Sequence, residues 1–206
     1  MNIKVVHHVR ILHNCIYKDD QKLFESATLP FPQFSESAYR HFQLAYPKFH
    51  KMDDLSKLGW LAADILLNNS ELDISKSPFK RGIILSNKNS SLDTDARYFN
   101  MVKAGIASPA VFVYSLPNIV IGEICIRHGI KGENTFFIAD QYNIPAQVDY
   151  INNLFETGVI ESAIGGWVEL MNDQYDAFLY YAVKGNSGSH FYPHTAETIE
   201  KLYQQK

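Results

Sequence analysis

The sequence predicts an α/β fold, in which about five mostly parallel strands are layered with helices on both faces. Residues 82–85 (Gly-Ile-Ile-Leu) form a short, fully apolar run, as in a parallel strand that is covered on both faces. Residues 135–139 (Thr-Phe-Phe-Ile-Ala) form a second run of this kind, which breaks into polar residues directly before a helical pattern. Strands that alternate with helices indicate βαβ units with right-handed crossovers.

The first part of the chain begins with a strand at residues 2–12, because apolar positions nearly alternate there among β-branched neighbours. Residues 19–50 carry three prolines among scattered aromatic residues, and we expect an irregular insertion packed onto a surface. A helix should follow Asp53 or Asp54 as its N-cap and should end at residues 68–69, both asparagine.

The strand at residues 82–85 should lead through a polar loop, residues 86–91, into a helix at about residues 93–102. After residues 135–139, a helix is expected over residues 144–157. Its apolar residues, which should point inward, are Val148, Ile151, Leu154 and Phe155.

Pro145 suits the first turn of this helix, and Gly158 suits its end. Residues 162–170 and 177–183 should form two strands joined by a turn at residues 172–174. Residues 184–206 are expected to be a flexible tail that can include a short helix.

Length and composition indicate one domain over residues 1–206, since 46% of the residues are hydrophobic and can fill one sizeable core. The net charge is -3 and no basic run occurs, so nucleic acid is not expected as a partner. No stretch is long and apolar enough for a membrane span, and no signal-peptide core is present, so we expect a cytoplasmic protein.

No cofactor or metal is expected. A Walker A loop and a Gly-x-Gly-x-x-Gly fingerprint are both absent from the sequence. Cys15 and Cys125 lack the spacing of a zinc or redox site, so both should be free thiols. His7 and His8 are neighbours on a predicted strand, where they point to opposite faces and cannot bind one metal ion together.

Several segments resemble the β-ketoacyl-acyl carrier protein synthases. They are Ser-Pro at residues 108–109, Leu-Pro-Asn at 116–118, Gly122, and Ile-Arg-His-Gly-Ile-Lys-Gly-Glu-Asn at 126–134. Residues 51–59 and 163–169 are similar to a helix start and a strand of the same family, and the match runs through residues 46–185 in the family's order. The resemblance implies the amino-terminal half of a thiolase-like fold.

Gln141 occupies the position that the resemblance assigns to the family's nucleophilic cysteine, with Asp140 beside it. A carboxamide cannot form a thioester, so the resemblance implies that no catalytic residue is intact. Chain length factors of aromatic polyketide synthases, which are ketosynthase-like partners, are similar in having glutamine here. The alternative is that Gln141 is an ordinary strand-end residue whose amide caps the next helix.

The family also has a second half with two catalytic histidines, which this sequence lacks. His190 and His194 are interpreted as surface residues, and Arg127 and His128 as a packing and hydrogen-bonding motif. A half-fold should expose apolar surface unless residues 19–50 and the tail cover it.

The resemblance implies that residues 135–139, including Phe137, lie where a ketosynthase or a second copy joins. The resemblance also makes four side chains of residues 108–121 candidates to face an acyl tunnel or the interface. These candidates are Phe112, Tyr114, Leu116 and Ile119. That they are core residues instead is an equal alternative.

The resemblance therefore implies a non-catalytic, chain-length-factor-type subunit that partners a ketosynthase, or forms a homodimer, in type II fatty acid, polyketide or polyene biosynthesis. Acyl carrier protein would be an indirect partner. Two alternatives remain open: a malonyl-acyl carrier protein decarboxylase of the glutamine type, and a stand-alone module that binds acyl groups or carrier protein.

Overall fold

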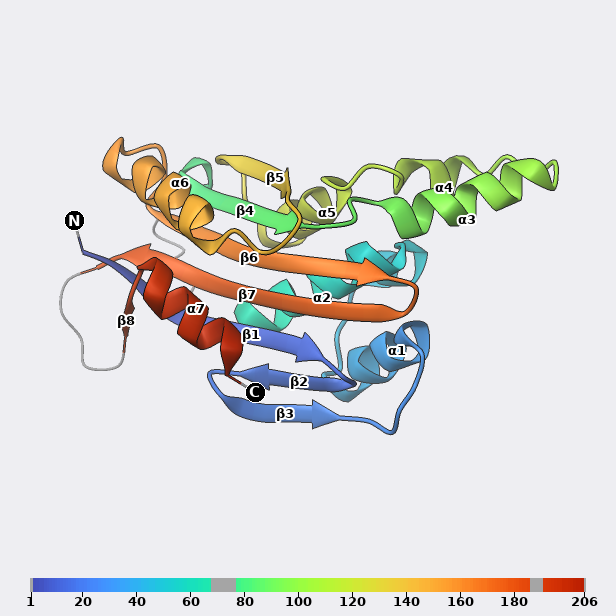
Figure 1. The fold of residues 1–206 in the computed structure, drawn as a ribbon, viewed down its shortest axis with the longest axis horizontal. Coiled ribbons are helices and arrows are strands. Elements are labelled where there is room, and N and C mark those ends of the chain that lie inside the picture. The colour runs from blue at the N-terminus through green and yellow to red at the C-terminus, as the bar shows by residue number, and fades with distance from the viewer. Residues whose placement is uncertain (1, 68–76, 186–190, 206) are drawn as a thin grey trace.

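One sheet forms the centre of the protein in the computed structural model, which describes residues 2–67, 77–185 and 191–205. All eight strands of these residues belong to it: β1 (Ile3–Leu12), β2 (Cys15–Lys18), β3 (Gln21–Glu25), β4 (Arg81–Asn87), β5 (Asn134–Ile138), β6 (Ser162–Met171), β7 (Gln174–Lys184) and β8 (Tyr192–Pro193). The order is β3-β2-β1-β7-β6-β4-β5, and β8 pairs with β1 (Figure 1).

The α/β class is confirmed, but the expectation of about five mostly parallel strands is wrong in number and direction. Only β4 pairs in parallel, with β5 and with β6, while the other neighbours are antiparallel. Short turns explain the antiparallel pairs. Asn172 and Asp173, for example, form a two-residue turn between β6 and β7, and both have positive φ. A turn this short can join only antiparallel neighbours.

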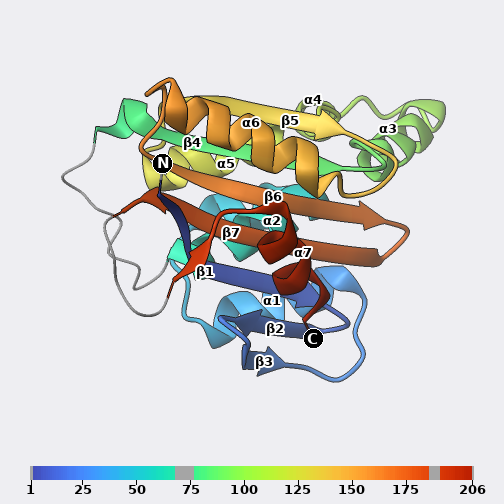
Figure 2. The ribbon, with the colours of Figure 1, turned by 60° about the vertical axis from the view of Figure 1, so that its left-hand side comes forward.

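Helices cover both faces of the sheet, as the sequence predicts (Figure 2). One face carries α1 (Phe31–His41), α2 (Asp54–Leu67) and α5 (Ile119–His128), and the other carries α6 (Ile144–Glu156) and α7 (Ala196–Gln204). Two further helices, α3 (Leu92–Lys103) and α4 (Pro109–Val113), project away from the sheet (Figure 1). Short 3-10 helices lie at Pro47–Lys51 and Pro78–Lys80.

Several predicted elements are confirmed closely. The side chain of Asp53 accepts a hydrogen bond from the Ser56 N–H, at 3.0 Å, at the start of α2. The predicted end of this helix, at residues 68–69, lies outside the described residues. In α6, Pro145 lies in the first turn and all four predicted apolar residues are buried.

Residues 19–50 are not an irregular insertion, because they contain β3, α1 and a 3-10 helix. Pro30 precedes α1 and Pro32 lies in its first turn. The N–H groups of a first turn have no partner within the helix, so a proline there costs no hydrogen bond. Phe31, Phe34 and Ala38 then follow at spacings of three and four residues and are all buried. The prolines mark the start of a helix and do not interrupt one.

The strand predicted at residues 135–139 exists as β5, but it is not buried on both faces. It is the outermost strand of the sheet, beside β4, and most of its residues are exposed or half-buried. The backbone edge of β5 that faces away from β4 has no neighbouring strand among the described residues.

The tail is also more ordered than expected. Residues 186–190 lie outside the described part, but residues 192–193 form β8 and residues 196–204 form α7. Ile199 and Leu202 of α7 are buried against the same face as α6. Arg10 of β1 donates to Asp176 at 3.0 Å and to the Tyr203 carbonyl at 2.9 Å, which ties α7 to the sheet.

His194, expected at the surface, is buried between β8 and α7. Its Nδ1 lies 2.7 Å from the Asn152 Oδ1, and its Nε2 lies 3.1 Å from the Tyr180 hydroxyl. Burial lowers the pKa of His194 to about 4, so the imidazole is neutral in the folded protein near pH 7. His190 lies outside the described residues.

Candidate functional site

The candidate site begins at the turn between β5 and α6, which we call the Gln141 turn (residues 139–143). The Ala139 N–H donates to the Asn87 carbonyl at 3.0 Å, so the turn starts next to the end of β4. Asn143 caps α6, since its Oδ1 accepts from the Ala146 N–H at 3.3 Å.

Gln141 and Asp140 are both exposed in a bend that follows β5. The prediction that Gln141 ends a buried strand is therefore wrong, although the direct passage of the turn into the helix is confirmed. The alternative that the Gln141 amide caps α6 is also wrong, because Asn143 fills that position.

Tyr142 is the residue of the turn that points inward. Its ring packs on Trp167 and Tyr203, with centroid distances of 5.7 and 5.3 Å. Its hydroxyl donates to the Gln147 Oε1 at 2.7 Å, and Gln147 in turn donates to the Gly166 carbonyl at 3.0 Å. Burial raises the pKa of Tyr142 well above 10, so the hydroxyl stays a neutral donor. The turn is thus anchored by a half-buried aromatic residue.

A small apolar pocket of about 240 Å³ lies beside the Gln141 turn. It runs between the end of β5 and the first turns of α6, and its lining residues include Phe137, Ile138, Ala139 and Tyr150. Gln141 does not line it. The pocket can hold a hydrocarbon group or an apolar side chain, because most of its lining is carbon, with polar groups contributed by Ser86, Asn143 and Gln147.

Neither cysteine lies at this turn. Cys125 lies on α5, and burial raises the pKa of its thiol to about 11, so it is protonated at neutral pH. Cys15 is buried in β2, and neither cysteine forms a disulfide. Within the described ranges, no group of three or more histidine, cysteine, aspartate or glutamate residues is arranged to hold a metal ion.

The edge of β5 is apolar. Phe137 is 39% exposed and packs edge-on against Tyr150, at a centroid distance of 5.4 Å, and Ile138 is exposed next to it. A strand edge of this kind offers unpaired backbone groups together with apolar side chains, which is the arrangement that another strand can extend.

The four tunnel or interface candidates of residues 108–121 divide into two groups. Phe112 and Leu116 are 58% and 56% exposed, so the alternative that they are core residues is wrong for this pair. Tyr114 is buried and donates to the Glu123 Oε1 at 3.1 Å, while Ile119 is half-buried against the core. Only the first pair can touch another molecule directly.

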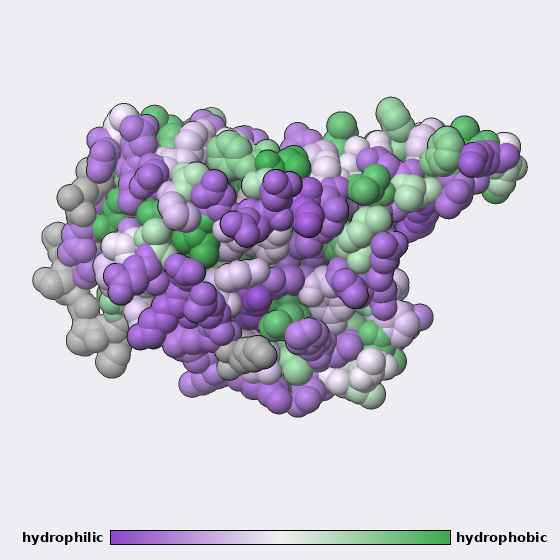
Figure 3. Space-filling model, in the orientation of Figure 1, coloured by the Kyte–Doolittle hydropathy of each residue, from purple (hydrophilic) through white to green (hydrophobic). Residues whose placement is uncertain are grey.

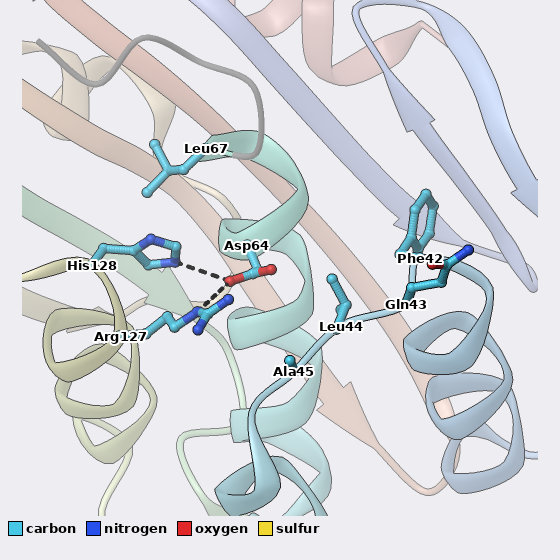
Figure 4. A pocket seen from close by; sticks show the side chains of 8 residues that line it. All are labelled: Phe42, Gln43, Leu44, Ala45, Asp64, Leu67, Arg127 and His128. Atoms are coloured by element: carbon cyan, nitrogen blue, oxygen red, sulfur yellow. Dashed lines mark hydrogen bonds and ion pairs between the residues drawn. The ribbon is translucent and has the colours of Figure 1, made fainter.

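Arg127 and His128 lie together at the end of α5, as the packing interpretation expects. The Arg127 Nε donates to the Asp64 Oδ1 at 2.8 Å, and the His128 Nε2 lies 3.6 Å from the same oxygen (Figure 4). Burial lowers the pKa of His128 to about 4 despite the carboxylate. The three residues line an open pocket of about 430 Å³ next to residues 42–45.

Among the helices of the described residues, none is long and apolar enough to cross a membrane. No protein-family model matches the sequence, and no curated protein matches it.

Solved structures match the fold. A search finds the ishigamide ketosynthase/chain length factor at a TM-score of 0.68 and 14% identity, covering 91% of this chain and 63% of the other. It also finds a chain of the ketosynthase ApeO in complex with its chain length factor ApeC, from Xenorhabdus doucetiae, at a TM-score of 0.60 and 11% identity. That match covers 98% of this chain and 90% of the other.

A third match is AntDE:AntF, a type II acyl-carrier protein in complex with its ketosynthase bound to the hexaketide, at a TM-score of 0.63 and 13% identity. It covers 89% of this chain and 62% of the other, so the protein spans less than two thirds of the length of the ishigamide and AntDE:AntF relatives. At these identities the likeness shows the fold, and the protein has the thiolase-like α/β fold of ketosynthase and chain length factor chains.

Proposed function

We propose that this protein is a non-catalytic subunit, similar to a chain length factor, that pairs with a ketosynthase in a type II fatty acid, polyketide or polyene system. The observation that carries the proposal is the outer edge of β5. On this side the strand has no neighbour among the described residues, and its exposed apolar side chains lie there in a thiolase-like fold. The resemblance of the sequence assigns this strand to the contact with a ketosynthase.

The two ends of the sheet differ in a way that supports this choice. At the other end, β3 carries Lys22 and Glu25, whose charged groups lie 2.7 Å apart in an exposed ion pair. Charges on an edge strand oppose its pairing with another chain. The sequence of β5 (Asn-Thr-Phe-Phe-Ile) has no charged residue, so only this end is suited to strand addition.

The face of the sheet that carries α6 is also covered by the chain's own C-terminal residues. The helix α7 packs beside α6 on that face and buries Ile199 and Leu202. The outward residues of α7 are polar, and Figure 3 shows this region as largely hydrophilic. The apolar face expected for a half-fold is therefore covered by the chain's own tail.

The geometry of the turn supports the non-catalytic part of the proposal. Gln141 is exposed and has no acid or base beside it that could take part in acyl transfer, apart from Asp140 in the same bend. The buried thiol of Cys125 is protonated and lies on another element. In this proposal the partner performs condensation, and acyl carrier protein is engaged through that partner.

Co-expression with the ketosynthase encoded nearest to this gene tests the proposal. Sedimentation should give a one-to-one heterodimer, and the interface should exceed roughly 2,000 Å² in total if it is obligate. The variant Phe137→Asp should abolish the complex, because it places a carboxylate in an apolar interface.

Leu23→Asp is the matched control, since Leu23 is exposed to 37%, close to the 39% of Phe137, but lies on β3. It should leave the heterodimer intact, and circular dichroism should show that both variants are folded. A protein that stays monomeric with the ketosynthase, or that forms a homodimer only, contradicts the proposal. So does release of carbon dioxide from malonyl-acyl carrier protein by the isolated chain.

A further inference from the structure

We infer that helix α7 holds the Gln141 turn, and through it the end of β5, in the conformation that a partner binds. Tyr203, in the last turn of α7, is the positioning residue. The inference rests on the proposed function for the partner, which is the ketosynthase. It adds a residue that controls docking from outside the docking edge.

Helix α7 is fixed to the sheet at both ends. Before its first turn, the Nε2 of His194 lies 3.1 Å from the Tyr180 hydroxyl of β7. In its last turn, the Tyr203 carbonyl accepts from Arg10 at 2.9 Å, and the Tyr203 hydroxyl donates to Asp176 at 2.8 Å. Figures 1 and 2 both show α7 on the face of the sheet that carries α6. Contacts at both ends therefore define where α7 lies on this face.

The Tyr203 ring joins α7 to the Gln141 turn. It meets the Tyr142 ring edge-on at a centroid distance of 5.3 Å, which is a favoured arrangement for two aromatic rings. The same ring packs against Phe178 of β7 at 5.5 Å, and the Arg10 guanidinium lies 3.9 Å from its centre. The sheet thus holds the Tyr203 ring in the position where it supports Tyr142.

Tyr142 connects this support to the docking edge. Its hydroxyl donates to the Oε1 of Gln147 at 2.7 Å, and Gln147 is buried. Gln147 also lines the pocket beside the turn, together with Phe137 and Ile138 of the β5 edge. If Tyr142 moved away, the buried Gln147 oxygen would lose its donor, which is unfavourable for a buried polar group. A change at Tyr203 therefore reaches the β5 edge through two contacts.

These contacts favour a permanent support over a cover that the partner displaces. Lifting α7 from the sheet would expose Ile199 and Leu202, which are both buried, and would break the hydrogen bonds of Tyr203 to Arg10 and Asp176. Docking at β5 does not itself replace them, because β6 and β4 lie between β7 and β5 in the sheet. We therefore expect α7 to stay in place when the partner binds.

Amide exchange in the full chain, without any partner, tests the support of the turn. The Ala139 N–H donates to the Asn87 carbonyl and the Ala146 N–H donates to Asn143, so these two amides report on the start and the end of the turn. Both should exchange about tenfold faster in Tyr203→Ala, because the turn opens locally more often. Tyr203→Phe keeps the ring and should exchange like the wild type.

Tyr175→Ala is the matched control. Tyr175 is also a half-buried tyrosine of β7, it packs against the rings of Phe31 and Phe34, and its hydroxyl accepts from the Asn14 N–H at 2.9 Å. It lies on the other face of the sheet, so this variant should lose stability and leave both amides at wild-type rates. Equal acceleration in Tyr175→Ala and Tyr203→Ala, or no acceleration in Tyr203→Ala, overturns the inference.

Sedimentation with the co-expressed ketosynthase tests the consequence for docking. Tyr203→Ala should bind about tenfold more weakly than the wild type, whereas Tyr203→Phe and Tyr175→Ala should bind as the wild type does. Wild-type affinity of Tyr203→Ala overturns the inference and leaves the proposed function standing. Tighter binding of this variant does the same, because it would make α7 a cover. A wild-type chain that binds no ketosynthase overturns the proposed function, and the exchange rates alone then decide whether α7 holds the turn.

Discussion

The buried His194 predicts a specific loss of stability in mild acid. In the folded protein its neutral ring satisfies both nitrogens, with Nδ1 donating to Asn152 and Nε2 accepting from the Tyr180 hydroxyl. Its pKa is lowered from 6.5 to about 4 by burial, whereas in the unfolded chain it returns to the ordinary value. Between these two values the unfolded state binds one more proton than the folded state does.

The sign and size follow from this difference. Stability contributed by His194 is fully present above pH 6.5 and is lost as the pH falls toward 4. The full loss is about 3 kcal/mol, at about 1.4 kcal/mol for each unit of pKa difference. From pH 7 to pH 5 the loss is about 2 kcal/mol, which is a substantial part of the stability of a small domain.

Urea unfolding at pH 7 and pH 5 measures the effect, with His194→Gln as the comparison. Other groups, including the half-buried His128, titrate in both proteins, so the difference between wild type and variant isolates His194. The variant should lose less stability than the wild type on acidification, by about 2 kcal/mol. An equal loss in both proteins, or an imidazole resonance assigned to His194 that titrates near pH 6.5 in the folded wild type, refutes the reasoning.

Three further outcomes are expected. Gly165→Ala should lower stability by about 1–3 kcal/mol in urea unfolding, because the added Cβ would collide with the Tyr180 ring. An unchanged unfolding midpoint would contradict this packing. Leu202→Ala should lower stability by about 2–5 kcal/mol and speed amide exchange in α7, whereas unchanged exchange would mean that α7 is not held by this contact. Gln141→Cys should leave the protein unlabelled by radioactive acyl-acyl carrier protein in the absence of a ketosynthase. The base next to it in the bend, Asp140, is a carboxylate and too weak to deprotonate an ordinary thiol, and a covalent label would contradict the non-catalytic role.

The elements that could be predicted from sequence are those whose local signals agree. Helix α6 combines a proline in the first turn, an apolar stripe and a terminal glycine, so its bounds are nearly correct. The hairpin of β6 and β7 is also specified by neighbouring residues, because the two residues of its turn adopt positive φ. In contrast, the signal of Pro30 and Pro32 is ambiguous. Proline is typical of irregular segments, but it also favours the start of a helix, as it does here.

The tail could not be predicted because its order depends on distant partners. The helix α7 is held by Arg10 and Asp176, which lie far from it in the sequence. The burial of His194 depends in the same way on Asn152 and Tyr180. A short polar segment of this kind has little local reason to be ordered.

The candidate site was predicted in part. Position 141 was located by counting along the motif, and the structure places it in the turn before α6. The sequence did not show that the side chain of Tyr142 turns inward and leaves Gln141 in solvent, because the aromatic residues that receive Tyr142 come from three other elements. The exposure of Phe112 and Leu116 likewise depends on how far α3 and α4 project from the sheet.

The charged strand β3 has a consequence for how many molecules can join. A subunit with two receptive sheet ends would recruit a neighbour at each, and repeated head-to-tail contacts would produce an open fibre. Here the Lys22–Glu25 pair makes one end unreceptive, while β5 at the opposite end stays receptive. If the proposed contact forms at β5, growth should stop after that single contact, so even at high concentration the resulting complexes should stay small and finite.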